Sequence, residues 1–520
     1  MSLRLAVLLS AFLAFISLSY EVVWFRAFSF ATGGTAGTFG ILIGVFLAGI
    51  AFGARIAEKR IRSGDERAGL WTDLAVRLFI ANLLAFAVIP MMGVTVEIAN
   101  GMLAFEGVGL AAVGWGAALP LISHLAVNAD EAAGRKVSYM YAANIVGSVA
   151  GTLLTGFVFM DVMSLETICA ILAATGLVSS VLLIAFAPAG KTTRFIFTGV
   201  GALVSIGALL LTPKAFDRIF EKLLFKERVP PAYALAAQVE NRSGVITVLN
   251  DGQVFGSGAY DGRISTDLVA DSNDIVRAYA VAALHPNPGR VLVIGLSTGA
   301  WTQVVANIPS VDSVTVVEIN PGYLELIARY RPVRSLLKNP KVNIVIDDGR
   351  RWLRRNPDEK FDAIVMNTTL HWRAHSSNLL SVEFLALARS HLKPGGILHY
   401  NTTGSREAVK TGLSSFPYGL RFMSMATVSD SPITWHAAKF REVLANFSID
   451  GKKVFDLSLP EHRAALDRVA TMGEVTTSTD PKGVESREHA LSRLASARVV
   501  TDDNMIPEWK TAWINRLLDR

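Results

Sequence analysis

The chain has 520 residues, of which 51% are hydrophobic and 18% charged, and its formal net charge at pH 7 is +6. A mean hydropathy of +0.39 is too high for an ordinary soluble enzyme, and the single cysteine, Cys169, excludes an internal disulfide and a cysteine-based metal site. The charge is modest for this length, and the sequence has no long basic run or nucleic-acid module. We therefore expect neither a nucleic-acid partner nor a bound metal.

The apolar excess lies in the first 213 residues, and the composition becomes ordinary from residue 214 onward. A membrane span needs about 20 apolar residues, and seven stretches of the chain qualify. They are residues 3–23, 36–54, 74–95, 102–124, 139–160, 165–187 and 195–212. Residues 1–213 are therefore predicted to form an α-helical transmembrane bundle of about seven helices. We expect an integral protein of the inner or cytoplasmic membrane, with the lipid bilayer as a partner.

Basic residues gather in alternate connections between these stretches. They are Arg55, Lys59, Arg60, Arg62 and Arg67, then Arg135 and Lys136, and finally Lys191 and Arg194. Because cytoplasmic loops carry an excess of lysine and arginine, this pattern places the N-terminus inside, and seven crossings then leave the globular part outside. An even number of crossings would leave it inside, and the short last stretch, 195–212, could be re-entrant. The side of the globular part therefore stays open.

The rest of the chain divides into four predicted segments. Residues 214–234 alternate apolar pairs with charges, which is typical of an amphipathic linker on a membrane surface. Residues 235–285 contain short β-branched runs separated by Asn-Asp-Gly and Asp-Gly turns, and they are predicted to form a small β-rich domain with one helix. Strands then alternate with helices, which predicts an α/β Rossmann-like domain over residues 286–450 and a helical extension over residues 451–520.

Four buried strands are predicted at residues 290–295, 314–319, 342–346 and 362–366. The first runs into a glycine-containing turn that opens a helix, and the second ends in Glu318, about twenty residues after the turn. This spacing is typical of a nucleotide site in which a carboxylate accepts hydrogen bonds from ribose hydroxyls. In such sheets, ligands bind at the carboxyl ends of the strands. Those ends carry Gly295 to Gly299, Glu318, Asp347 with Asp348, and Asn367.

The segments "HPNPGRVLVIG", "SVTVVEINP", "IDDGRRWL", "FDAIVMNTT", "NLLSVEFL" and "LKPGGILHYN" resemble the spermidine synthase family of polyamine aminopropyltransferases, and in particular its membrane-fused branch. The similarity covers about residues 235–435. It implies a methyltransferase-like Rossmann domain behind a small β domain, with S-adenosylmethionine or its decarboxylated relative as cofactor. By this resemblance, Gly295 and Gly299 lie against the methionine portion of the ligand, Glu318 holds the ribose, and Asp348 with Gly349 approaches the adenine. Ser297 and Asp347 complete the expected cofactor-binding residues.

The sequence departs from the family where the acceptor amine would bind. The position of Asn367 is normally an aspartate that helps to deprotonate the amine, and an amide cannot take a proton. The usual acidic-Pro-Gly continuation is replaced by "LHWRAHSSN", and the tyrosine–glutamine pair of the β domain appears as "RSGVITV". These changes remove the acidic groups that would grip a polyamine, so we expect a small-molecule, lipid or glycan acceptor that is not a polyamine.

The loop after the fourth strand supplies the candidate catalytic residues. Asn367 could position the substrate, and His371 is the side chain there whose pKa suits proton transfer near neutrality. His375 lies four residues further on, and Arg373 offers a planar fork for phosphate or carboxylate. Alternatively, the loop is structural, with Trp372 buried against the bundle or the β domain and Arg373 capping carbonyls.

The sequence therefore predicts a membrane-anchored, spermidine-synthase-like transferase that uses S-adenosylmethionine or a relative on a non-polyamine, anionic or lipid or sugar acceptor. Two alternatives remain open. One is a transport or scaffold protein whose Rossmann domain is catalytically altered. The other is an extracytoplasmic enzyme that acts on an envelope polymer or lipid without S-adenosylmethionine. A homodimer is a further expectation.

Overall fold

The computed structural model describes residues 1–99, 103–188, 190–226, 234–367, 369–478, 480 and 482–510. The chain divides into two compact units. The first comprises Met1–Thr32, Gly37–Ala234 and Glu240–Gly244, and the second comprises Gly33–Ala36, Leu235–Val239 and Val245–Arg520. The predicted bundle and linker thus fall almost entirely in the first unit. The short segment Gly33–Ala36 belongs instead with the second.

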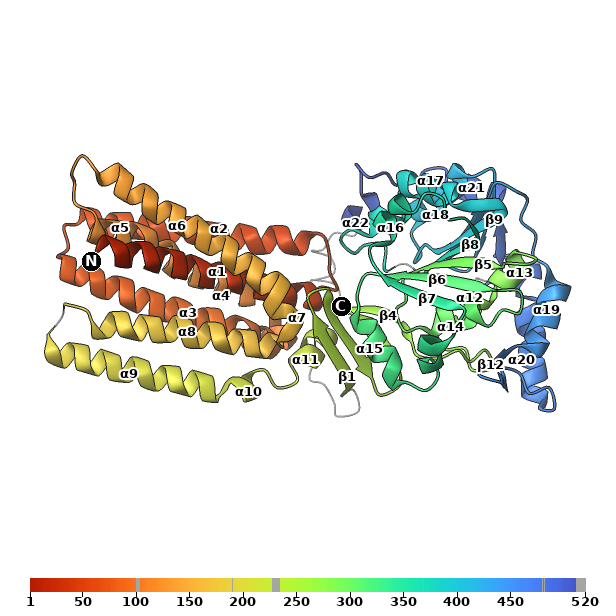
Figure 1. The fold of residues 1–520 in the computed structure, drawn as a ribbon, viewed down its shortest axis with the longest axis horizontal. Coiled ribbons are helices and arrows are strands. Elements are labelled where there is room, and N and C mark those ends of the chain that lie inside the picture. The colour runs from red at the N-terminus through yellow and green to blue at the C-terminus, as the bar shows by residue number, and fades with distance from the viewer. Residues whose placement is uncertain are drawn as a thin grey trace. The chain divides into compact units, whose positions relative to one another are not determined.

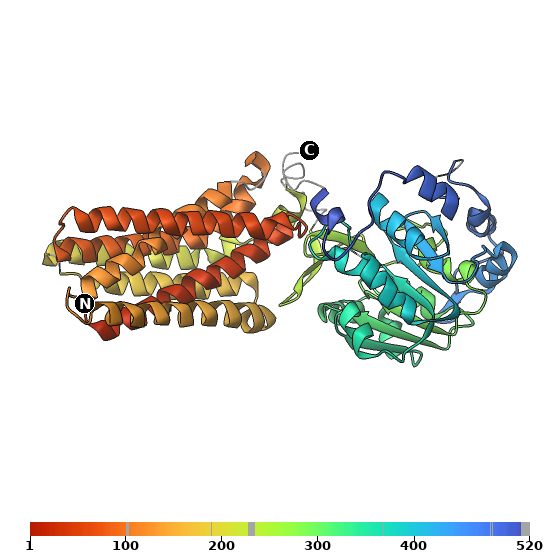
Figure 2. The ribbon, with the colours of Figure 1, turned by 90° about the horizontal axis from the view of Figure 1, so that it is seen from above.

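The first unit is helical. Its elements are α1 (Leu3–Ala31), α2 (Gly37–Arg62), α3 (Arg67–Ala99), α4 (Leu103–Gly116), α5 (Ala118–Ala126), α6 (Ala133–Leu154), a π-helical turn η1 (Thr155–Phe159), α7 (Met160–Val162), α8 (Leu165–Ala185), α9 (Lys191–Leu210), α10 (Thr212–Ala215) and α11 (Ile219–Phe225). The long helices lie side by side (Figure 1, Figure 2). Within the described part of the chain, seven helical stretches are long and apolar enough to cross a membrane. The predicted helical bundle is confirmed.

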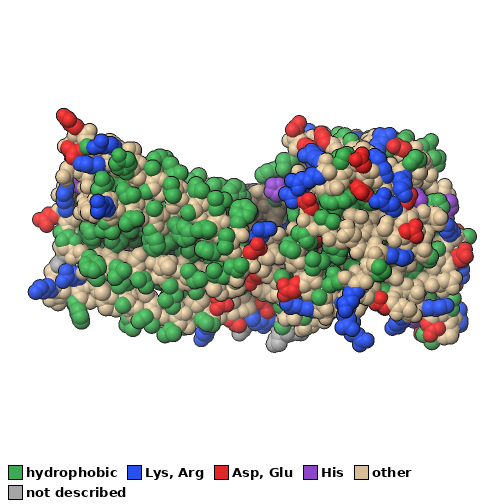
Figure 3. Space-filling model, viewed as in Figure 1, with side chains coloured by type: hydrophobic (Ala, Val, Ile, Leu, Met, Phe, Trp, Pro, Cys, Tyr) green, Lys and Arg blue, Asp and Glu red, His purple; other side chains and the backbone are tan. Residues whose placement is uncertain are grey.

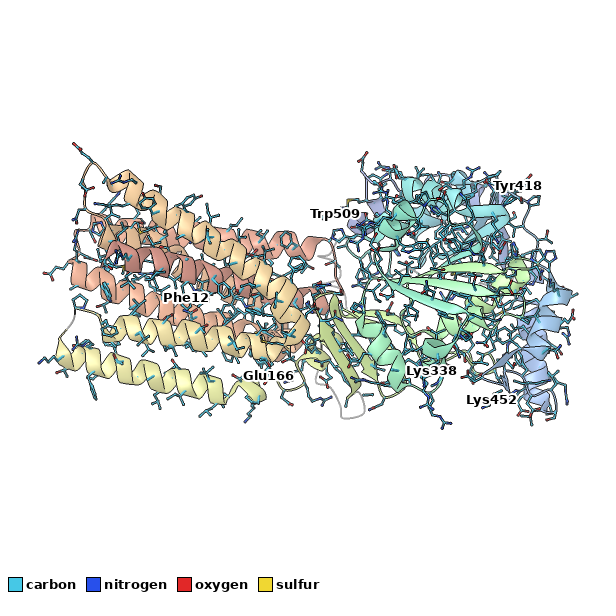
Figure 4. All side chains as sticks on the ribbon, viewed as in Figure 1. Phe12, Glu166, Lys338, Tyr418, Lys452 and Trp509 are labelled. Carbon is cyan, nitrogen blue, oxygen red and sulfur yellow. The ribbon has the colours of Figure 1, made fainter. Side chains whose placement is uncertain are left out.

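Apolar side chains cover the outer surface of this unit. Only 11% of the most apolar stretch of α9 is buried. Hydrophobic side chains gather over the helices in Figure 3. Exposed side chains such as Phe195, Leu203 and Leu210 on α9 belong to this surface. Large contiguous apolar surface of this kind is typical of a protein that faces lipid. Figure 4 shows Phe12 on α1 and Glu166 at the beginning of α8.

The predicted amphipathic linker does not form one continuous helix. Its first residues belong to α10, and α11 begins directly after Arg218, which lies in the left-handed region at φ +52°. The apolar side of α11 is buried within the first unit, where the Phe220 ring lies 4.9 Å from that of Phe30. Residues 227–233 of the predicted linker lie outside the described residues.

The second unit contains a four-stranded sheet in the order β1-β2-β3-β4. Its strands are β1 (Leu235–Asn241), β2 (Gly244–Leu249), β3 (Gln253–Gly256) and β4 (Ala259–Arg263). Gly252, in the Asn-Asp-Gly turn between β2 and β3, has φ +82°, which suits glycine. Two short helices follow, α12 (Val276–Tyr279) and α13 (Val281–Leu284), where one was predicted.

An eight-stranded sheet forms the centre of the second unit, in the order β14-β10-β11-β9-β8-β5-β6-β7. Its strands are β5 (Arg290–Ile294), β6 (Ser313–Glu318), β7 (Val342–Ile346), β8 (Phe361–Met366), β9 (Leu392–Asn401), β10 (Tyr418–Phe422), β11 (Met425–Ser429) and β14 (Val484–Ser486). The five strands β5 to β9 are parallel to one another. The other three pair in antiparallel fashion. The four predicted strands are observed to within one residue at either end.

Helices cover both faces of this sheet (Figure 1). One face carries α12, α13, α14 (Ala300–Ala306), α15 (Gly322–Arg329), α19 (Ala437–Asn446) and α20 (Pro460–Ala470) over one apolar core. The other face carries α16 (Gly349–Arg355), α17 (Val382–Ser390), α18 (Arg406–Ser415) and α21 (Arg487–Arg493) over a second core. This is the doubly wound α/β arrangement that the sequence predicts.

The remaining elements are short. They are the 3₁₀ turns η3 (Arg334–Lys338), η4 (Ser376–Leu379) and η5 (Met472–Glu474), the small hairpin β12 (Ser448–Ile449) and β13 (Lys452–Lys453), and α22 (Ile506–Lys510). The helical extension expected over residues 451–520 also supplies β14, which adds to the edge of the main sheet. That strand was missed because three residues show no usable alternation.

Candidate active site

Three segments meet where the parallel strands β5, β8 and β9 end. In the sheet, Ile294 of β5 pairs with Met366 of β8, and Met366 pairs with Tyr400 of β9. The residues that follow these strands therefore emerge at one edge. They are the turn at 295–299, the segment beginning at Asn367, and the segment at 401–403. This edge is where ligands bind in doubly wound folds.

The turn after β5, residues 295–299, has an unusual backbone. Gly295, Ser297 and Gly299 all have positive φ, at +91°, +47° and +77°. A Cβ added to Gly299 would lie 2.9 Å from the side chain of Ile327, so glycine is required there for space as well as for conformation. Ser297 adopts the left-handed region without being glycine. Strain of this kind concentrates at functional sites.

Glu318 holds this turn in place. Glu318 is 4% exposed, and its carboxyl group accepts hydrogen bonds from the backbone N–H groups of Leu296 at 2.7 Å, Ser297 at 3.3 Å and Asn320 at 2.7 Å. Burial raises the pKa of Glu318 to about 7. A carboxylate has about four acceptor positions, so one more can accept a bond from a ligand hydroxyl.

The predicted adenine residues occupy the end of β7 and the start of α16. Asp348 caps α16 by accepting a 2.7 Å hydrogen bond from the N–H of Arg351. Asp347 accepts a 2.7 Å bond from the N–H of Asp348 and pairs with the guanidinium of Arg351. A Cβ on Gly349 would lie 2.6 Å from Ile294, so this helix start packs closely on the strand that leads to the glycine turn. These contacts give the three residues structural tasks, and their role toward a ligand stays a prediction.

A cavity of about 180 Å³ lies beside the glycine turn. Its lining consists of Tyr260, Asp261, Gly262, Asn273, Arg277, Asn367, Leu370, Asn401, Thr403 and Ser424. The amide Nδ2 of Asn401 donates to Oδ1 of Asn367 at 3.1 Å, and the N–H of Thr403 donates to Oδ1 of Asn401 at 2.9 Å. Asn367 therefore lines a cavity, and its role toward a substrate stays a prediction. This side chain orients other groups through hydrogen bonds.

Two charged side chains line this cavity. Asp261 accepts a hydrogen bond from the hydroxyl of Tyr323, and burial raises the pKa of both groups. Arg277 donates from Nη1 to Ser424 Oγ at 2.8 Å and from Nη2 to the carbonyl of Asn273 at 3.0 Å. Its guanidinium also lies 5.4 Å from the centre of the Trp301 ring. Both side chains are therefore held in fixed positions.

The tryptophan and arginine of the "LHWRAHSSN" loop pack within the second unit. Trp372 is 7% exposed, and a Cβ on Gly33 would lie 2.9 Å from its ring. Arg373 donates from Nη1 to Thr369 Oγ1 at 2.8 Å, and its side chain lies against Gly34. The residue after it, Ala374, donates its N–H to the carbonyl of Gly34 at 2.8 Å. Neither side chain lines the cavity, which favours the structural interpretation of this part of the loop.

The two histidines of the loop differ in their surroundings. His371 donates its backbone N–H to Thr403 Oγ1 at 2.8 Å, and its Nδ1 lies 2.9 Å from the same oxygen. His371 therefore contacts a residue that lines the cavity. His375 is exposed, has φ +67°, and donates its N–H to Glu508 at 2.9 Å. The structure does not bring His375 to the cavity.

The sequence analysis missed Asp261 and Arg277. Asp261 lies in an Asp-Gly pair that reads as a hairpin turn, but the pair lies within β4. Arg277 belongs to a short helix with no local motif. Asn401 and Thr403 could have been found, because they follow β9 and the same rule identified Asn367 after β8.

Residues 276–417 match the spermine/spermidine synthase domain. A polyamine aminopropyltransferase of Agathobacter rectalis is 31% identical over 147 residues, which cover 27% of this chain and 50% of the relative. One from Mycobacterium tuberculosis is 27% identical over 311 residues, covering 56% of this chain and 57% of the relative. The chain thus spans about half the length of the curated relatives it matches.

Among solved structures, a spermidine synthase in complex with the transition-state analogue AdoDATO is 20% identical to this chain. The alignment covers 45% of this chain and 84% of that one, with a TM-score of 0.35. The domain match identifies the C-terminal part of the chain as a spermidine-synthase-type domain. The resemblance predicted from the strand and loop motifs is confirmed for this part.

Proposed function

We propose that this protein is a membrane-anchored, spermidine-synthase-like transferase that uses S-adenosylmethionine or its decarboxylated relative as donor. The observation that carries the proposal is that the turn at residues 295–299 lies directly beside the cavity lined by Asp261. Ser297 lies in the turn held by Glu318, and its Oγ donates a 2.7 Å hydrogen bond to the carbonyl of Asp261, which lines the cavity. Such a donor supplies a carbon made electrophilic by its bond to a sulfonium. The turn and the cavity would hold donor and acceptor side by side.

The charges of the cavity favour an acceptor that is not a polyamine. A polycationic amine needs several carboxylates, and Asp261 is the sole acid in the described lining, with a pKa raised by burial. Amides and hydroxyls supply most of the other polar groups, and Arg277 brings a positive charge. Guanidinium groups recognise phosphate and carboxylate. We therefore propose for Arg277 the anion-binding role that the sequence suggested for Arg373.

The size of the cavity limits which part of the acceptor can enter. About 180 Å³ is smaller than the roughly 300 Å³ at which sites for drug-sized molecules begin. Only the reactive end of a larger molecule would fit. A lipid headgroup or the end of a glycan meets this limit, and the seven long apolar helices in the described part of the chain would give access to both at a membrane.

The experiment uses membranes that contain the full chain, permeabilised so that both faces are accessible. S-adenosylmethionine and decarboxylated S-adenosylmethionine, each labelled in the transferable group, are added with and without putrescine. We expect label in the lipid or glycan extract and none in spermidine. Arg277→Gln should lower this incorporation at least tenfold, and Arg290→Gln, which removes an exposed arginine paired with Glu359, should leave it unchanged. Label in spermidine alone, or in no fraction, contradicts the proposal.

The distribution of charge favours a second candidate, an extracytoplasmic enzyme that acts on an envelope polymer or lipid without S-adenosylmethionine. The seven apolar helical stretches found among the described residues, α9 included, are each long enough to cross a membrane. The basic connections then place the N-terminus inside and the second unit outside. Reporters fused to the C-terminus, one active inside and one active outside the cytoplasm, separate the two candidates. The S-adenosyl-dependent function requires the inside signal, and an outside signal favours the second candidate.

A further inference from the structure

Asp261 occupies a distinctive place in the cavity. It lies in β4 between Tyr260 and Gly262, and all three residues line the cavity. A Cβ on Gly262 would lie 3.5 Å from Thr298, so β4 runs close to the glycine turn at this point. The Asp261 carboxyl accepts a hydrogen bond from Tyr323, and the Asp261 carbonyl accepts one from Ser297 of the turn. Residue Asp261 therefore lies where the two proposed ligand positions adjoin.

We propose that Asp261 is the proton acceptor of the transfer reaction and that Tyr323 is its positioning residue. This inference rests on the proposed function and names the group that performs its proton transfer. It departs from the roles expected from the sequence, in which the loop after β8 supplied the base. Asn367 has no basic atom, and Nδ1 of His371 lies against Thr403 rather than in the cavity lining.

The path from donor site to base is short and rigid. Glu318 ends β6 and holds the glycine turn through Leu296 and Ser297. Two residues further on, Asn320 accepts a 3.0 Å hydrogen bond from the N–H of Gly322, which fixes the start of α15. Tyr323 follows Gly322 on α15. It is 6% exposed, and its hydroxyl donates a hydrogen bond to the Asp261 carboxyl. One loop thus positions both the turn and the base.

The surroundings of Asp261 make its carboxylate a stronger base than an exposed aspartate. The groups that face it are Tyr323 on α15, Glu318 at the end of β6, and Arg373 in the loop after β8, and Arg277 also lines the cavity. Burial raises the pKa of Asp261, and the hydrogen bond from Tyr323 and the charge of Arg373 oppose that rise. A carboxylate with a raised pKa is the stronger base.

The proposed step conserves atoms and electrons. The nucleophilic nitrogen or oxygen of the acceptor forms a bond to the carbon attached to the donor sulfonium. The carbon–sulfur bond breaks, and its electron pair remains on sulfur, which leaves as a neutral thioether. The acceptor's proton passes to the Asp261 carboxylate and then to solvent.

The test compares Asp261→Asn with Asp251→Asn in the full chain. Asp251 precedes β3 of the same small sheet and is not part of the described cavity lining. The permeabilised membranes and labelled donors serve for rate, and titration of purified protein with methylthioadenosine serves for donor binding. We expect Asp261→Asn to keep its affinity for methylthioadenosine within about twofold and to lose about 100-fold in rate. Asp251→Asn should change neither quantity.

A pH profile separates a positioning role of Tyr323 from a merely structural one. The tyrosine hydroxyl stabilises the charged carboxylate, so its removal raises the pKa of Asp261. In Tyr323→Phe, the acidic limb of the rate profile should therefore move to higher pH. An unshifted limb at an unchanged donor affinity overturns the role given to Tyr323.

Chemical labelling tests the wild-type chain without any variant. Dicyclohexylcarbodiimide modifies protonated carboxyls in apolar surroundings. Because the pKa of Asp261 is raised and that of Asp251 is lowered, labelling of the Asp261 peptide should persist to a higher pH than labelling of the Asp251 peptide, and methylthioadenosine should protect Asp261. Full rate in Asp261→Asn with donor bound overturns this inference alone. No donor binding by the wild-type chain overturns it together with the proposed function.

Discussion

Ser297 Oγ donates a 2.7 Å hydrogen bond to the backbone carbonyl of Asp261, which joins the turn after β5 to strand β4 of the small sheet. Ser297 makes this bond from a left-handed backbone at φ +47°. One residue thus links the proposed donor turn to the proposed acceptor cavity, at a cost in backbone strain.

Two variants separate the bond from the strain. Ser297→Ala loses the hydrogen bond and keeps the strained backbone, so the free energy of unfolding should fall by about 1 kcal/mol. Ser297→Gly also loses the bond, but glycine adopts positive φ without strain. We therefore expect Ser297→Gly to melt at a higher temperature than Ser297→Ala in thermal unfolding of the full chain in detergent. The reverse order would contradict a strained role for Ser297.

A matched pair of glycines tests the packing of the turn. Gly299 and Gly395 have nearly the same φ, +77° and +79°, but an added Cβ meets Ile327 at 2.9 Å in the first case and nothing within 4 Å in the second. Both alanine variants pay roughly 1 kcal/mol for the left-handed backbone. Gly299→Ala should lose a further 1–3 kcal/mol or so through overpacking. Equal melting temperatures would contradict the close packing described for the turn.

The raised pKa of Glu318 predicts how stability depends on pH. Its value of about 7 in the folded chain lies above the ordinary 4.5, so the native state binds more protons than the unfolded state between these values. The free energy of unfolding should therefore decrease as pH rises through this window, by at most about 1.4 kcal/mol per pH unit. Melting temperatures measured from about pH 5 to about pH 8 check the sign.

Glu318→Gln should remove this part of the pH dependence, because an amide does not titrate in this range. Glu325→Gln is the control, since Glu325 is exposed and pairs only locally with Arg329 on α15. It should follow the wild-type profile. A wild-type slope that survives in Glu318→Gln would assign the dependence to another group.

Two aspartates that each pair with an arginine test how much the contacts of the C-terminal segment stabilise the fold. Asp502 accepts two hydrogen bonds from Arg350, at 2.7 and 2.5 Å, and one from Ser381 Oγ at 2.6 Å. Asp430 pairs with Arg389 in an exposed position. Breaking the more buried network should cost about 1–3 kcal/mol, whereas an exposed pair contributes roughly 0–1 kcal/mol. We expect Asp502→Asn to lower the melting temperature more than Asp430→Asn.

The central strands could be predicted because their sequence carries the signal. Continuous β-branched runs bounded by turns identified β5 to β8 to within one residue, which fixed the positions of Gly299, Glu318 and Asn367 after or at the strand ends. Their role toward a ligand stays a prediction. These features depend on local pattern and on parallel pairing of successive strands. Neighbouring residues are enough to specify them.

The cavity could not be predicted because it depends on contacts between distant residues. Asp261 and Tyr323 are 62 positions apart, and no pattern in either segment indicates the other. The burial of Trp372 against Gly33 joins segments still more distant in sequence. The break of the predicted linker at Arg218 arises from packing of α11 within the first unit, which overrides its helical periodicity.

The most direct measurement is a calorimetric titration of the purified full chain with S-adenosylmethionine, and then with its decarboxylated relative. The wild-type chain should bind at least one of them with a one-to-one stoichiometry. Glu318→Gln should weaken that binding at least tenfold, and Glu325→Gln should not. Absence of heat with both compounds, or equal affinity in Glu318→Gln and wild type, would contradict the assignment of the turn as the donor site.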